Sequence, residues 1–135
     1  MIKDIERPKV EDIAIAAVPE KNEESGADEW YIYLMNKKAV AINNVLISSR
    51  GYGKSDEREV KTSELRHYVE ELPAHSYVKV EPIMEELFAL NNQYWVSFYI
   101  DGKIFDKKYI FLPETIREAN LTEIAMMGKK GVMLS

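Results

Sequence analysis

The amino-acid sequence predicts an all-β protein: an immunoglobulin-like two-layer β-sandwich of about seven strands with one short helix. Three observations support this fold class. An aromatic β-hairpin is readable in residues 94–112, short runs of β-branched and aromatic residues recur along the chain, and turn residues separate those runs at intervals of about ten residues. A barrel or an α+β fold is also compatible with the pattern, because apolar and polar residues do not alternate strictly.

The hairpin is the most clearly predicted element. Residues 94–100 read Tyr-Trp-Val-Ser-Phe-Tyr-Ile, and residues 103–112 read Lys-Ile-Phe-Asp-Lys-Lys-Tyr-Ile-Phe-Leu. Asp101 and Gly102 between them are typical of a type I′ turn, in which both central residues need a positive φ angle. A two-residue loop would fix the pairing of the two strands along their whole length.

This register gives the hairpin an inner face and an outer face. Phe98 pairs with Phe105, and Tyr94 pairs with Tyr109, on the face that we expect to point into the core. A one-residue slip would exchange the faces of one strand and set charged residues opposite apolar ones. The other face points toward water and carries Trp95, Ser97, Tyr99, Ile104, Asp106 and Lys108.

Three strands are predicted in the first half of the chain. Residues 10–18 alternate until Pro19 ends the run, although their alanines would also suit a helix. Residues 30–35 are apolar or aromatic on both faces, which is typical of a central strand that is covered on both sides. Residues 40–49 alternate again, with Asn43-Asn44 interrupting them as a turn or a bulge.

The one predicted helix covers residues 64–72. Its apolar residues recur at helical spacing, Thr62 and Ser63 precede it as N-caps, and Pro73 stops it. Residues 76–83 then alternate as a strand that ends at a sheet edge, because proline cannot donate to the ladder.

The remaining segments are less regular. Residues 60–62 suit a short edge strand, residues 84–90 suit either one helical turn or a strand, and residues 115–127 have a weak helical pattern. We expect residues 1–9 to be a loose lead-in, residues 10–127 to form one globular domain, and residues 128–135 to be a tail that is either docked or frayed.

Composition and charge exclude several classes of protein to which this chain could otherwise belong. A hydrophobic fraction of 46% in 135 residues is enough for one folded domain with its own core. The net charge of −5 argues against non-specific nucleic-acid binding, which needs a basic surface. The absence of cysteine excludes disulfides and zinc–thiolate sites. The chain has neither an apolar signal segment nor a run long enough to cross a membrane, so we expect a cytoplasmic protein that does not bind membranes.

One segment resembles a phosphate-binding loop. Residues 48–55 read Ser-Ser-Arg-Gly-Tyr-Gly-Lys-Ser, so Lys54 and Ser55 would be the nucleotide contacts. The carboxylates of residues 56–59 disfavour this, because they would lie beside the phosphate. The simpler interpretation is a flexible loop in which Gly51 and Gly53 adopt positive φ angles.

Other candidate chemistry is weak. His67 and His75 are eight residues apart, which fits neither a helical metal pair nor a short metal-binding loop. The acidic pairs at residues 70–71 and 85–86 are typical of solvated surfaces, and no Gly-x-Ser-x-Gly motif occurs. The sequence therefore predicts no catalytic residue, no metal and no cofactor.

The outer face of the hairpin is the best candidate for function. Its four candidate residues are Trp95, Tyr99, Asp106 and Lys108. Exposed aromatic residues on a sheet bind protein partners or stack against sugars. We therefore expect a non-catalytic protein-interaction module or, alternatively, a carbohydrate- or small-ligand-binding sandwich. In a third interpretation, the predicted helix or the C-terminal segment covers this face.

Four segments of the chain also resemble a known family. They are residues 30–34 (Trp-Tyr-Ile-Tyr-Leu), 45–53 (Val-Leu-Ile-Ser-Ser-Arg-Gly-Tyr-Gly), 61–67 (Lys-Thr-Ser-Glu-Leu-Arg-His) and 91–98 (Asn-Asn-Gln-Tyr-Trp-Val-Ser-Phe). Over nearly its whole length the chain resembles a family of small uncharacterised bacterial proteins, some of which are labelled phenylalanyl-tRNA synthetase. The chain lacks the ATP-binding arginine motif of such a synthetase, and its acidity disfavours tRNA binding. The resemblance therefore implies no activity.

Overall fold

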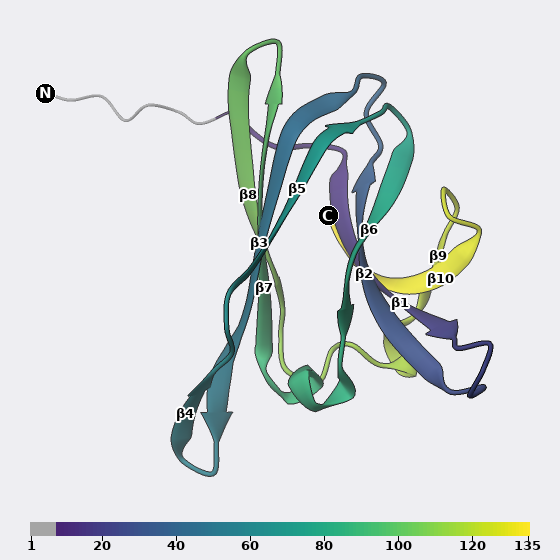
Figure 1. Cartoon of the computed structure of the whole chain (residues 1–135), viewed down its shortest axis with the longest axis vertical. Helices are drawn as coiled ribbons and strands as arrows, with labels where there is room; N and C mark the ends of the chain where they lie inside the picture. Colours follow the sequence, from purple (N-terminus) through teal and green to yellow (C-terminus); the bar gives the residue numbers. More distant parts are fainter. Residues whose placement is uncertain (1–7) are drawn as a thin grey trace, which may run out of the picture.

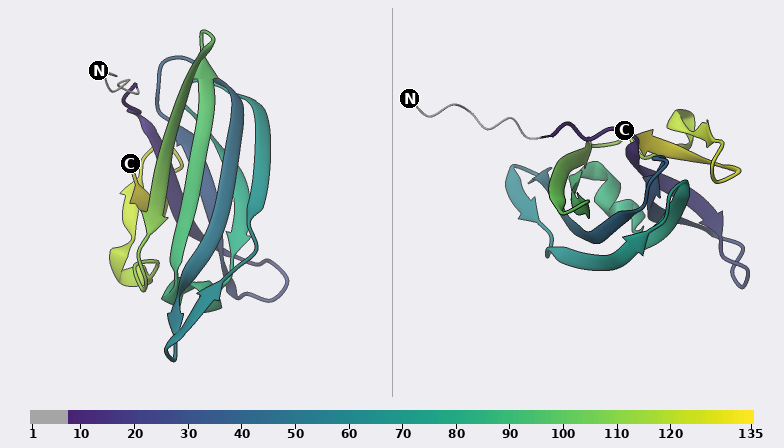
Figure 2. Two further views of the ribbon diagram at one scale, coloured as in Figure 1. Left: turned by 90° about the vertical axis from the view of Figure 1, so that its left-hand side faces the viewer. Right: turned by 90° about the horizontal axis from the view of Figure 1, so that it is seen from above.

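The computed structural model describes residues 8–135, and within them the protein is all-β, with ten strands in two antiparallel sheets (Figure 1). Seen from above, the two sheets curve around a common interior (Figure 2). The sandwich predicted from the sequence is therefore present at the level of two packed sheets. The lead-in predicted for residues 1–9 lies largely outside the described residues.

The first sheet has the strand order β6-β2-β1-β10-β9. Its strands are β1 (Ile13–Lys21), β2 (Asp28–Asn36), β6 (Ser76–Ile83), β9 (Thr122–Ile124) and β10 (Lys129–Leu134).

The second sheet has the order β4-β3-β7-β8, and β5 also pairs with β3. Its strands are β3 (Ile42–Ser55), β4 (Arg58–Lys61), β5 (Leu65–Leu72), β7 (Asn91–Ile100) and β8 (Lys103–Phe111).

The predicted hairpin is confirmed as β7 and β8. Phe98 lies opposite Phe105, and the two rings stack with centroids 5.3 Å apart. Asp101 and Gly102 form the turn with φ angles of 49° and 73°, as a type I′ turn requires. On β7 the inward-facing Tyr94, Val96 and Phe98 are buried, whereas Trp95 and Tyr99 on the outer face are exposed.

The helix predicted for residues 64–72 is wrong, because this segment forms β5. Its side chains also fit a period of two: His67 and Val69 are half-buried, while Arg66 and Tyr68 are exposed. A nine-residue helix is marginal by itself. As a strand, the segment satisfies the backbone groups along the edge of β3 between Ile42 and Ser49.

The other helical predictions reduce to two short 3-10 helices. Residues 84–90, left open between a helical turn and a strand, contain η1 (Glu85–Ala89). Residues 115–127 contain only η2 (Glu118–Asn120) before β9. No α-helix occurs in residues 8–135, so the short helix of the predicted fold is absent.

β3 is longer than predicted, and of the turn and the bulge considered for Asn43-Asn44 it contains the bulge. Its pairing with β7 shifts between Asn43 and Leu46, and Asn44 has a φ angle of 48°. A bulge of this kind adds an unpaired residue and bends the strand.

The core fills the space between the sheets, and a second cluster lies on the far side of the first sheet. The central strand β2 is covered on both faces, as its sequence predicts. Residues of the second cluster include Ala14, Ala16 and Met35, which pack against Ile124 and Met127 of the C-terminal segment. Of the two arrangements considered for residues 128–135, the structure has the docked one, because β10 pairs with β1.

Candidate functional site

The outer surface of the second sheet carries the largest group of exposed apolar side chains. Trp95 and Tyr99 of β7 are each 39% exposed, and Ile104 of β8 is 52% exposed. The strand register places Leu46 of β3 and Tyr68 of β5 on the same surface. We call this surface the Trp95 face; its apolar residues are Leu46, Tyr68, Trp95, Tyr99 and Ile104.

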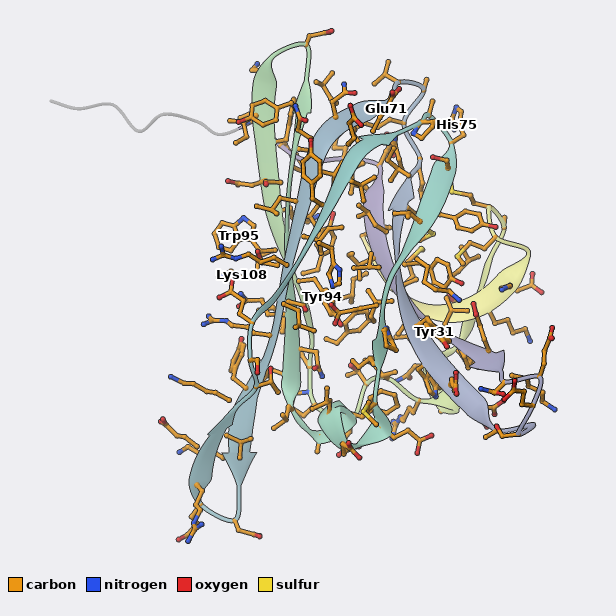
Figure 3. The ribbon with its side chains drawn as sticks, in the orientation of Figure 1. Tyr31, Glu71, His75, Tyr94, Trp95 and Lys108 are labelled. Carbon is orange, nitrogen blue, oxygen red and sulfur yellow. The ribbon has the colours of Figure 1, made fainter. Side chains whose placement is uncertain are left out.

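Basic side chains flank Trp95 across the sheet. Arg66, Ser48, Trp95 and Lys108 follow one another on β5, β3, β7 and β8. The Lys108 ammonium lies 5.2 Å from the centroid of the Trp95 ring, within the range of a cation–π contact. Trp95 and Lys108 both point away from the sandwich (Figure 3).

A hollow of about 410 Å³ adjoins this row, and Arg50 and Gln93 lie on its border together with Trp95. Among the four candidate residues, Asp106 is half-buried and lies opposite Ser97. Strand pairing therefore brings all four onto one surface, as their register predicts. Neither β5 nor the C-terminal segment covers this surface, since Trp95 and Tyr99 are exposed.

The residues that resemble a phosphate-binding loop lie elsewhere and are extended. Lys54 pairs with Glu59, and Ser55 pairs with Arg58, at the end of β3. Asp56 and Glu57 form the following turn with positive φ angles, and β4 follows instead of a helix. The backbone therefore lacks the helix N-terminus that holds phosphate in such loops.

The expectation that Gly51 and Gly53 adopt positive φ angles is wrong, since both belong to β3. These positions lack a side chain because the neighbouring groups come close. A Cβ atom on Gly51 would lie 3.0 Å from the Thr62 methyl, and one on Gly53 would lie 3.2 Å from the Leu90 side chain.

A polar cluster that sequence reasoning missed lies where the two sheets separate. The Glu81 carboxylate of β6 accepts hydrogen bonds from Ser49 Oγ at 2.8 Å and from the Tyr94 hydroxyl at 3.3 Å. His67 Nε2 lies 2.8 Å from the same carboxylate. Burial and the Glu81 charge raise the pKa of Tyr94 far above its usual value.

The cluster was missed because a bulge turns Glu81 inward. Strict alternation along residues 76–83 would point Glu81 outward with Tyr77 and Lys79. The register of β6 against β2 shifts between Lys79 and Glu81, which reverses the direction of Glu81. Ser49 bonds to Glu81 and not to His67, so the cluster lacks the nucleophile–base contact of a hydrolase.

A second concavity, which we call the acidic groove, has a volume of about 550 Å³ and lies at the start of β2, the end of β6 and η1. Its apolar lining includes Trp30, Ile83 and Met84. Its border carries four carboxylates: Asp28, Glu29, Glu85 and Glu86. Hydrogen bonds from Tyr31 and then Asn22 lower the pKa of Glu29 below its usual value.

Two further observations concern metal ligands and membrane spans. In the described residues no three histidine or carboxylate side chains come together as metal ligands would. The two short helices in the same residues are far below the length needed to cross a bilayer. No protein-family model, curated protein or solved structure matches the chain.

Proposed function

We propose that the protein is a non-catalytic interaction module that binds a protein partner through the Trp95 face. The observation that carries this proposal is the gathering of five large apolar side chains, each at least 39% exposed, on one side of one sheet. Single exposed apolar residues are ordinary, but a contiguous group of this kind is typical of an interaction surface. Tryptophan and tyrosine are also the residues that contribute most to binding at such surfaces.

The charges around Trp95 favour an acidic partner. The protein has a net charge of −5, yet three cations, Arg50, Arg66 and Lys108, lie around Trp95 on its own sheet against two carboxylates, Glu64 and Asp106. A partner segment with one apolar side chain between acidic ones would meet Trp95 and these three cations together. Complementary charges of this kind speed association and exclude wrong partners.

Selection from a random peptide library tests this proposal. We expect the selected peptides to combine acidic residues with an apolar or aromatic residue. Trp95→Ala should weaken their binding by about tenfold or more, because it removes the central aromatic contact. Lys108→Glu should also weaken binding and reduce its salt dependence.

The matched control is Tyr77→Ala, which removes a similarly exposed aromatic residue from the other sheet. This variant should bind the peptides as the parent chain does. Binding that survives Trp95→Ala, or a library that yields no acidic peptide, would contradict the proposal.

Sugar binding is the second candidate function, since the Trp95 ring is exposed beside the polar side chains of Gln93 and Ser97. It is less well supported, because the Lys108 ammonium already lies over that ring. A glycan array tests it: binding that depends on Trp95 would favour a sugar over a protein partner, and no binding at high protein concentration would remove this candidate.

We also infer that the sandwich is immunoglobulin-like. Supporting this, the first, second and sixth strands are neighbours in one sheet, and β3, β7 and β8 are neighbours in the other. This order matches strands A, B and E opposite C, F and G, with β5 beside β3 as the additional edge strand. Interstrand NMR contacts between β2 and β6, and between β3 and β7, test the order; pairing of β6 with β5 instead would contradict it.

A further inference from the structure

The acidic groove has the features of a docking surface for an apolar and basic partner. Its lining is mainly apolar, and Met84 at its border is 62% exposed. Asp28, Glu85 and Glu86 form no ion pair with any other side chain of residues 8–135. An exposed apolar surface bordered by unneutralised acids would gain most from a partner that brings cations with apolar groups.

The Trp95 face of the same chain has that complementary chemistry. It combines exposed aromatic rings with Lys108 and with Arg66, which lies in an exposed ion pair 3.7 Å from Glu64, whereas the groove combines an apolar floor with four carboxylates. The acidic, apolar partner expected for the Trp95 face is therefore present on a second copy of this chain.

We infer that the chain associates with itself head to tail, with the Trp95 face of one copy seated on the acidic groove of the next. This inference rests on the proposed function, because it names the partner of the Trp95 face. Lys108 and Arg66 would meet Glu85 and Glu86, and Trp95 would lie against Met84.

The positions of the two surfaces determine what kind of assembly results. Trp95 and Lys108 lie on the outer side of the second sheet, whereas Tyr31, at the groove, belongs to β2 of the first sheet (Figure 3). An interface between two different surfaces is heterologous, and it extends into an open chain of subunits unless its rotation closes a ring. The assembly should therefore grow beyond a dimer as the protein concentration rises.

Sedimentation velocity of the full chain, from micromolar to near-millimolar concentration, tests the assembly. We expect the mean mass to rise beyond that of a dimer at low salt and to fall when salt is added, because exposed charges carry the contact. Two variants should each abolish growth: Glu85→Lys with Glu86→Lys in the groove, and Arg66→Glu with Lys108→Glu on the Trp95 face. Association should weaken by about tenfold or more in each.

Mixing the two variants gives the sharpest result. One retains a working Trp95 face and the other a working groove, so an equal mixture should form a one-to-one dimer that grows no further. The matched control for the groove variant reverses equal charge elsewhere: Glu118→Lys with Glu123→Lys should assemble as the parent chain does. Thermal unfolding of every variant verifies that it is folded.

Three outcomes would overturn the inference: a chain that stays monomeric at every concentration, a groove variant that still associates, or a mixture that does not pair. If the chain is monomeric but acidic peptides still bind in a Trp95-dependent manner, the self-association is wrong and the proposed function stands. If neither association nor peptide binding occurs, both are wrong.

Discussion

The side chain of a single residue, Glu81, links the two sheets through hydrogen bonds. Glu81 of β6 belongs to the first sheet, and its hydrogen-bond donors Ser49 and Tyr94 belong to the second, as does His67. Its side chain is only 10% exposed, so these partners replace most of its contact with water. A carboxylate in this position stabilises the fold only while its partners are present, because an unpaired buried polar group is costly.

Removing this carboxylate should therefore destabilise the protein. We expect Glu81→Ala to lower the free energy of unfolding by about 2 to 3 kcal/mol, because Ser49 and Tyr94 lose their acceptor. Glu81→Gln should cost less, since one acceptor oxygen remains. Urea denaturation at neutral pH measures both, and Glu70→Ala, an exposed glutamate on β5, is the control. A loss no larger than that of the control would mean that the cluster contributes nothing to stability.

At the scale of the elements, strand pairing between residues that are close in sequence could be predicted, whereas pairing between distant residues could not. The β7–β8 hairpin was predicted with its register because the Asp-Gly turn and the facing aromatic pairs are neighbours in sequence. The strand β5 was predicted as a helix because its apolar spacing fits both periods. The deciding interaction, pairing with β3, involves residues 16 to 30 positions away, from Ser49 opposite Leu65 to Ile42 opposite Leu72.

The functional surfaces also include a part that could be predicted from the sequence and parts that could not. The surface around Trp95 and Lys108 followed from the hairpin register alone, and only its extension to Leu46 and Tyr68 needed the sheet. The Glu81 cluster needs four strands and a bulge, and the acidic groove needs two strands and η1. No periodicity in the sequence contains that information, because it arises from the packing of one sheet against the other.

The C-terminal hairpin of β9 and β10 gives a prediction at this scale. Gly131 of β10 lies where a Cβ atom would be 2.8 Å from the Ile124 side chain and 3.0 Å from the Ala17 carbonyl oxygen. The side chain could move, but the backbone oxygen belongs to the central strand β1. Gly131→Ala should therefore force β10 away from β1 and lower the free energy of unfolding by about 1 to 3 kcal/mol.

Urea denaturation measures this change, and Lys130→Ala, at the exposed neighbouring position, is the control. Hydrogen exchange should locate the effect in β9, β10 and β1, while the β7–β8 hairpin keeps its protection. A Gly131→Ala protein as stable as the Lys130→Ala protein would contradict the close packing at this position.

At the scale of the whole molecule, the two sheets differ in what covers them. The first sheet is covered on part of its outer side by the C-terminal segment, which buries Met35 and Ala16, while Tyr77 on the same side stays exposed. Within residues 8–135 the second sheet has no such cover, and its outer side carries Trp95 and Tyr99 in contact with water. The fold therefore concentrates its exposed aromatic surface on one side, and that asymmetry is the basis of both proposals.

Two tyrosines buried in the core of the molecule make its stability depend on pH in alkaline solution. Tyr94 and Tyr109 are 2% and 3% exposed, and burial raises the pKa of each hydroxyl well above the usual 10.0. Tyr109 also donates a hydrogen bond of 2.6 Å to the Ile13 carbonyl across the sandwich. Both hydroxyls therefore stay protonated in the folded protein at pH values where the unfolded chain has begun to lose these protons.

The sign of the effect follows from this difference. Below pH 10.0 both states hold the protons, so the tyrosines contribute their full stabilisation. Above it the unfolded state binds fewer protons, and each buried tyrosine lowers the free energy of unfolding by about 1.4 kcal/mol per pH unit.

Urea denaturation between neutral pH and strongly alkaline pH should show this decline, and Tyr109→Phe should make it shallower by about that amount per unit. At neutral pH the same variant should lose about 1 kcal/mol with its hydrogen bond. Tyr99→Phe, at an exposed position, removes a hydroxyl without this burial, so a change in slope as large as that of Tyr109→Phe would show that burial is not the cause.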